Sequence, residues 1–347
     1  MLQKIIFFTI LLLSHCPFTN AQEAVRDGHV EARLIAENQS IQPGHPFWIA
    51  VHLTIDKGWH VYWENAGDSG LPVKATWNLP DHFNAGPLQW PYPEKIQEPP
   101  LVGYGYHDEV FLLTKIDLPS GLTTGEIKTL KAKIDWLVCK EGCIPGQANI
   151  SIQLPVDTAA PQINPQWSND FISTRSKLPL ATSDWMITAH NGDHLLIINL
   201  IAPAKEKHSL SDVYFFPQRD DLINHAGTQH LKKIPGGYTL TIPRSSLSSQ
   251  PIKQLKGVLV SNEGWRGLNT EHALSINIPV GDNLNLMIAL LFAFLGGLIL
   301  NLMPCVLPVL SLKILGFIKQ AGEDKTKLWI HGLVFTGGVL VSFWILA

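Results

Sequence analysis

The stretch that decides the fold covers residues 130–156 and reads LKAKIDWLVCKEGCIPGQANISIQLPV. Apolar residues occupy every second position over 130–138 and again over 148–156, which is the period of a half-buried strand. Glycine and proline residues, which favour turns, stand between these two halves. The pattern predicts two strands joined as a hairpin, with Cys139 and Cys143 at its tip.

The same alternation recurs along much of the chain, without helices at the spacing of βαβ units. Many short strands separated by turn residues predict two β-sandwich domains, over residues 22–157 and 184–281. A proline-rich, polar stretch over 158–183 predicts a linker, in which Asn164 and Pro165 would start a short helix. The further strands are expected at 48–55, 195–200, 213–216, 238–242, 258–260 and 274–280.

Composition excludes several classes of protein. The 347 residues are 46% hydrophobic and 16% charged, which is too apolar for a disordered chain. The formal net charge of −3 gives no basic footprint for nucleic acid. Four cysteines are too few for a disulfide-stapled miniprotein, so each cysteine needs its own explanation.

The apolar segments at the two ends predict export and membrane anchoring. Residues 1–21 carry Lys4, an apolar run and small residues before a cleavage point, as a signal peptide does, and Cys16 would leave with it. Residues 284–303 and 328–347 are apolar enough to span a bilayer. Lysines between these spans place the loop at about 313–327 in the cytoplasm by the positive-inside rule.

This topology predicts a bacterial inner-membrane protein with residues 22–283 in the periplasm. Residues 282–347 would then be the start of a transmembrane domain. Because the second span runs to Ala347, we expect the chain to be a truncated piece of a longer membrane protein.

The spacing of Cys139 and Cys143 leaves three interpretations open: a redox-active pair, a structural bridge and a soft-metal site. A bridge that closes five residues would contribute only about 2 kcal/mol, against about 3 kcal/mol for fifteen residues. Such a bridge is a poor staple and is better suited to exchange. A pair of thiolates would also suit Cu(I). The alternation puts Cys139 on the face of Lys131 and Lys133, so we expect its sulfur to point to solvent or a partner.

Cys305 lies between Pro304 and Pro308 at the cytoplasmic end of the first predicted span. Prolines this close break a helix, which a membrane tolerates only beside protein or a water-filled cavity. A thiol beside such a break could be reached from water, but it could equally be a small apolar residue within the span.

Together these segments resemble the DsbD-type thiol:disulfide interchange proteins, and most of all the ScsB-like branch. The cysteine hairpin, the exported aromatic segments and the membrane Pro-Cys run follow one another in the order typical of that family. The resembling segments are residues 136–146, 58–72 (GWHVYWENAGDSGLP), 89–93 (QWPYP), 104–106 (YGY) and 302–311 (LMPCVLPVLS).

The resemblance implies a mainly β chain of two immunoglobulin-like sandwiches, followed by the first transmembrane helices of a DsbD/CcdA-like membrane domain. Electrons would pass from cytoplasmic thioredoxin through the membrane domain to periplasmic disulfide proteins. Cys139 and Cys143 would be the exported pair and Cys305 the first membrane cysteine, with no cofactor or metal. Tyr104 and Tyr106 would either cap the pair or belong to the core.

The implied roles are protein-disulfide reduction, disulfide isomerisation and cytochrome c maturation. The second membrane cysteine and the C-terminal thioredoxin-like domain of the family are missing from this sequence, so the chain would be incomplete for electron transfer across the bilayer. The competing hypothesis is a copper-tolerance module that binds Cu(I) through Cys139 and Cys143.

Overall fold

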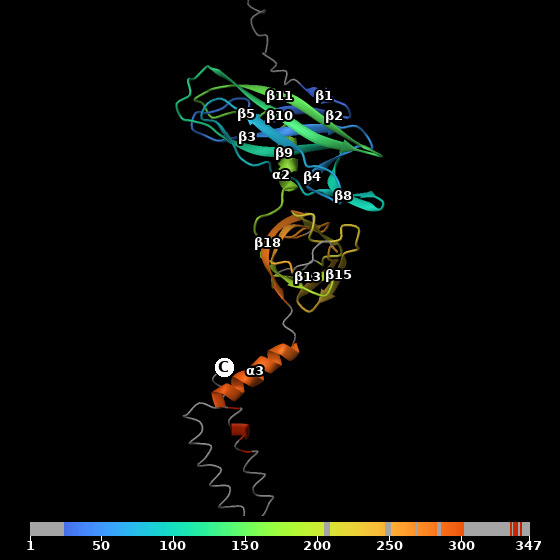
Figure 1. Ribbon diagram of the computed structural model, residues 1–347. Coiled ribbons are helices and arrows are strands. Elements are labelled where there is room, and N and C mark those ends of the chain that lie inside the picture. The colour runs from blue at the N-terminus through green and yellow to red at the C-terminus, as the bar shows by residue number, and fades with distance from the viewer. Residues whose placement is uncertain are drawn as a thin grey trace, which may run out of the picture. The chain divides into compact units, whose positions relative to one another are not determined.

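The computed structural model describes residues 24–204, 209–246, 251–267, 270–282 and 286–301, and a few positions between 334 and 341 (Figure 1). The chain divides into two compact units, Met1–Asp282 and Asn283–Ala347. The predicted signal peptide, Cys305 and the predicted second span, apart from those few positions, lie outside the described residues.

Two sheets build the N-terminal part of the first unit. The five-stranded sheet has the order β1-β2-β3-β9-β6, and the six-stranded sheet has the order β11-β10-β4-β8-β7, with β5 paired to β10. A shared apolar core that includes Trp63 and Trp136 fills the space between them. The strands are β1 Val25–Asp27, β2 Val30–Ala36, β3 Phe47–Ile55, β4 His60–Gly67, β5 Lys74–Asn78, β6 Asn84–Ala85, β7 Glu94–Glu98, β8 Leu101–His107, β9 Glu109–Asp117, β10 Ile127–Cys139 and β11 Cys143–Pro155.

The predicted hairpin is confirmed as the longest pairing of this domain. Strands β10 and β11 run antiparallel from Ile127↔Pro155 to Cys139↔Cys143 without a register shift. Alternate residues of both strands are buried, as period-two patterning requires. The cysteines therefore close the hairpin at its tip.

Helix α2, Ser168–Ser176, covers the outer face of the five-stranded sheet (Figure 1). Its Phe171 is fully buried against Ala50 and Leu113, while Arg175 binds both carboxylate oxygens of Glu37. The helix begins at Ser168, three residues after Pro165, and Asn164 opens the turn that precedes it, where its side chain accepts the Gln166 N–H.

The C-terminal part of the first unit is one continuous seven-stranded sheet, in the order β14-β17-β18-β12-β13-β16-β15. A parallel pairing of β12 with β18 joins its two halves, so that one apolar core is shared by both. The strands are β12 Met186–Asn191, β13 Leu195–Ile201, β14 Val213–Pro217, β15 His230–Ile234, β16 Gly237–Pro243, β17 Gln254–Ser261 and β18 Ala273–Asp282. The prediction of a mainly β chain is confirmed.

Helix α3, Leu286–Asn301, falls within the predicted first span. Among the described residues, no helix is both long and apolar enough to cross a membrane.

Candidate functional site

Cys139 and Cys143 form a disulfide at the tip of the hairpin, with an S–S distance of 2.02 Å and a Cα–Cα distance of 4.1 Å. The two residues differ in exposure, since Cys139 is 1% exposed whereas Cys143 is exposed. Only one sulfur of the pair is therefore open to an approaching molecule.

The expectation that the Cys139 sulfur points to solvent is wrong. Cys139 does lie on the face opposite the main core, as the alternation predicted, but it packs there with Tyr62 and Ala66 in a small apolar cluster. The cause is strand β4, which pairs with the end of β10 through Cys139↔His60. Side chains of β4 cover a position that would be exposed on an isolated hairpin.

Tyr62 is the cover over the disulfide, and sequence reasoning did not single it out. Its ring is fully buried and its hydroxyl lies 3.7 Å from the Cys143 sulfur. Burial, and then the negative charge of Glu98, raise the pKa of Tyr62 above its ordinary value. The hydroxyl therefore stays protonated and can donate to sulfur.

Two glycines make room for the Tyr62 ring. A Cβ at Gly70 would lie 2.5 Å from carbons of the ring, and a Cβ at Gly103 would lie 3.3 Å from it. Gly70 also has φ +112°, a backbone conformation that residues other than glycine rarely adopt. The clue in the sequence is that Tyr62 shares the alternation of His60 and so faces away from the core residues Val61 and Trp63.

Tyr104 and Tyr106 do not cap the pair; the alternative that they belong to the core is confirmed. Both rings lie in the main core of the first domain. The Tyr104 hydroxyl meets His225 Nδ1 at 2.9 Å, and Tyr106 donates to the carbonyl oxygen of Pro91 at 2.6 Å.

A buried histidine lies beside the disulfide. The side chain of His60 is only 4% exposed, its ring is 5.1 Å from that of Tyr62, and its Nε2 is 3.7 Å from Glu98 Oε1. Burial, with a contribution from His107, lowers the pKa of His60 to about 4. The imidazole is therefore neutral near pH 7 and adds no positive charge next to the sulfurs.

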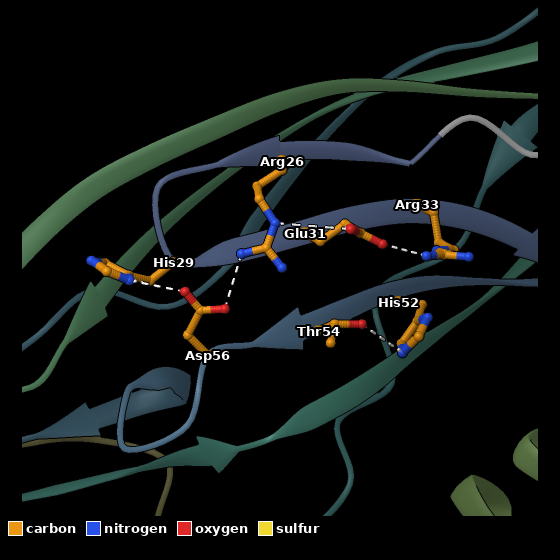
Figure 2. Close-up of polar contacts among 7 residues, drawn as sticks. All are labelled: Arg26, His29, Glu31, Arg33, His52, Thr54 and Asp56. Atoms are coloured by element: carbon orange, nitrogen blue, oxygen red, sulfur yellow. Dashed lines mark hydrogen bonds and ion pairs between the residues drawn. The ribbon is translucent and has the colours of Figure 1, made fainter.

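The exposed Cys143 opens into a shallow hollow of about 330 Å³, lined also by Trp59, Lys140 and Ile144. His29 stacks on Trp59 with ring centroids 3.7 Å apart. Asp56 Oδ2 lies 3.0 Å from His29 Nδ1, and Asp56 Oδ1 accepts a hydrogen bond from Arg26 Nη1 at 2.9 Å (Figure 2). This network fixes the aromatic wall of the hollow.

A metal site is not evident among the residues that the structure describes, where no group of three or more His, Cys, Asp or Glu side chains could hold an ion. Cys305 and its surroundings lie outside those residues. The site that can be described is thus one disulfide between the buried Cys139 and the exposed Cys143, with Tyr62 packed against Cys139.

Two comparisons with known proteins concern the domain that carries this disulfide. Residues 31–155 match the family model of the N-terminal part of the thiol:disulfide interchange protein DsbD. The match includes β10, the cysteine pair and all of β11, and it confirms the resemblance to DsbD/ScsB-type proteins.

The fold is similar to that of the N-terminal periplasmic domain of ScsB from Proteus mirabilis, with a TM-score of 0.54 at 15% identity, covering 76% of this chain and 98% of that one. Two other structures match but are too distant to inform function. The periplasmic chaperone SfaE has a TM-score of 0.21 at 12% identity, covering 72% of this chain and 99% of that one. The major pilin subunit BcpA of Bacillus cereus has a TM-score of 0.23 at 11% identity, covering 75% of this chain and 69% of that one. A search of curated proteins gave no match.

Proposed function

We propose that the chain is a protein-disulfide reductase module in which Cys139 and Cys143 exchange electrons with periplasmic disulfide proteins. The unequal exposure of the two sulfurs supports this role, because it gives each cysteine a separate task. A structural staple has no need of one buried and one accessible sulfur, and a loop of five residues would contribute little stability as a staple.

In the reduced pair, the exposed Cys143 thiolate attacks a sulfur of the partner's disulfide. A mixed disulfide forms, and the other partner sulfur leaves as a thiolate that takes up a proton. Cys139 then loses its proton and attacks the Cys143 sulfur, which releases the second partner thiolate and restores the Cys139–Cys143 disulfide. Two electrons and two protons pass to the partner, and the pair ends oxidised.

Tyr62 is a positioning residue in this scheme. Its O–H, 3.7 Å from the Cys143 sulfur, can strengthen its hydrogen bond when that sulfur becomes a thiolate. The burial of Cys139 beneath the Tyr62 ring restricts attack from outside to Cys143.

The source of electrons and the partners follow from the family resemblance. We propose that the chain is held in the inner membrane and that a membrane domain containing Cys305 reduces the pair again. Cytoplasmic thioredoxin would supply the electrons to this membrane domain. Disulfide isomerases and cytochrome c maturation factors are the proposed acceptors.

The second β domain contacts the first through Gln218, which donates to Glu64 at 2.9 Å, and Asn65, which donates to the carbonyl oxygen of Pro217 at 2.8 Å.

The test uses the full chain with Cys16→Ser and Cys305→Ser, here called the pair-only chain, so that only Cys139 and Cys143 react. After reduction, adding Cys139→Ser should trap a stable mixed disulfide with oxidised glutathione at Cys143. Adding Cys143→Ser should trap far less, because Cys139 is buried. Mass spectrometry of the intact chain reads both results.

Three outcomes would count against the proposal. A reduction potential of the pair below about −300 mV would mark a structural bond rather than an exchanging one. Equal trapping at Cys139 and Cys143 would show that the two cysteines do not have separate roles in exchange. Stoichiometric Cu(I) binding by the reduced pair, without any exchange with glutathione, would favour the copper-binding alternative.

A further inference from the structure

A second hollow lies beneath the cysteine hairpin, and the proposed exchange chemistry does not use it. This groove has a volume of about 720 Å³ and is lined by residues of β1, β4, β5, β10 and β11, together with residues 71–73 and Trp90. Its apolar walls include Leu71, Pro72 and Pro145, and Leu71 is 64% exposed. An exposed leucine beside other apolar side chains is typical of a contact surface.

The charges in this groove are mainly negative. Asp27, Glu64 and Asp135 line it together with Lys74. Outside the lining, Lys133 Nζ pairs with Asp135 at 2.8 Å, and the charge of Lys256 acts on Glu64. Glu64 is partly buried, and burial raises the pKa of its carboxyl group, although it accepts a hydrogen bond from Gln218. A positively charged side chain in the groove would stabilise the ionised form of Glu64.

The groove also contains a donor that lacks an acceptor. Trp136 is 4% exposed, and its indole Nε1 has no hydrogen-bond partner among the described residues. Gly146 lies directly against this nitrogen, because a side chain at Gly146 would collide with it. Trp136 and Gly146 both line the groove, and the indole N–H lies buried against Gly146.

We propose that this groove, here called the acidic groove, binds an extended segment of the redox partner that carries lysine or arginine and an apolar residue beside its disulfide. Apolar walls and a surplus of carboxylates together match the apolar and basic side chains of such a segment. The inference rests on the proposed exchange function and adds the chemistry by which the partner is chosen.

The groove and the exchange pair share the same hairpin. Asp135, Trp136 and Pro145 lie on β10 and β11, a few residues from Cys139 and Cys143. Leu71 follows Gly70, whose Cα lies against the Tyr62 ring. A chain held in the groove would lie along the strand that carries Cys143, two residues away at Pro145, and binding there would raise the rate of the first attack.

The experiment compares two synthetic nonapeptides on the reduced pair-only chain. Each has a central cysteine held as a mixed disulfide with mercaptoethanol and one flanking leucine; one peptide carries lysine on both sides and the other glutamate. Second-order rate constants are measured at low salt from the reoxidation of the pair. Hydroxyethyl disulfide, which is uncharged and too small to occupy the groove, reports exchange alone.

The lysine peptide should react faster than the glutamate peptide by about two- to fivefold for each groove carboxylate involved. Glu64→Gln with Asp135→Asn should remove most of this preference, whereas Asp117→Asn, an exposed carboxylate on β9 outside the groove, should keep it. Leu71→Ser should slow both peptides. None of these variants should change the rate with hydroxyethyl disulfide.

Equal rates for the two peptides, or a preference that survives Glu64→Gln with Asp135→Asn, would overturn the acidic groove while leaving exchange by the pair intact. If hydroxyethyl disulfide also fails to react with the reduced chain, the proposed function itself is lost. The two failures are thus distinguishable in one set of measurements.

Discussion

Replacing Tyr62 by phenylalanine tests whether the covering ring acts on the chemistry or only on packing. The change removes one oxygen atom and keeps the ring between Gly70 and Gly103. In the disulfide the lost contact is weak, since the hydroxyl lies 3.7 Å from a neutral sulfur. In the reduced state the same hydroxyl would donate to a thiolate, and a hydrogen bond to a charged group contributes about 1.5 kcal/mol or more.

A loss of about 1.5 kcal/mol corresponds to about tenfold less thiolate at neutral pH. The remaining thiolate is more nucleophilic, with a Brønsted coefficient near 0.5, so exchange should slow by about threefold. The reduced state is also less stable at a pH where Cys143 is ionised, so the reduction potential should fall by about 30 mV.

The assay is alkylation of the pair-only chain by iodoacetamide across pH, together with equilibration in glutathione buffers. Tyr104→Phe is the matched control, because Tyr104 is an equally buried tyrosine whose hydroxyl bonds His225 and not the disulfide. Alkylation and potential that stay at the parent values in Tyr62→Phe, or that change equally in Tyr104→Phe, would refute a role of the Tyr62 hydroxyl in exchange.

Three further predictions concern stability. Since burial lowers the pKa of His60 to about 4, protonation favours the unfolded chain, so stability should fall by about 2 kcal/mol as pH drops from 6.5 to 4; His60→Gln should flatten this slope in urea titrations. Gly146→Ala should lower the unfolding free energy by about 1–3 kcal/mol, because its methyl group collides with Trp136, and thermal unfolding measures the loss. Arg175→Met removes both hydrogen bonds to Glu37 and should cost about 1 kcal/mol, seen as faster hydrogen exchange in α2 with the cysteine hairpin unchanged.

The hairpin could be predicted from the sequence because its signal is local. Alternation over 130–138 and 148–156 and the turn residues between them define both strands and their register. The start of α2 was less predictable, since a turn that begins at Asn164 precedes the regular helix, which starts at Ser168 and places Phe171 on the outer face of the sheet.

The burial of Cys139 could not be predicted, because it depends on a strand distant in the chain. Parity correctly places the sulfur opposite the main core, but whether that face is covered is decided by β4, which pairs with Cys139 through His60. No local pattern reports which strand will lie beside β10 at its end. For the same reason the sequence did not distinguish Tyr62 from the other aromatic residues of segment 58–72.

The unequal exposure of the two sulfurs has a simple structural cause. Cys139 has a neighbour on each side, His60 on β4 and Cys143 on β11, whereas β11 is the edge strand of its sheet. A disulfide across the end of this hairpin must therefore place one sulfur under the side chains of β4 and the other at the rim. An incoming thiol or disulfide meets Cys143 first for steric reasons alone, so the choice of the attacked sulfur needs no additional acid, base or metal.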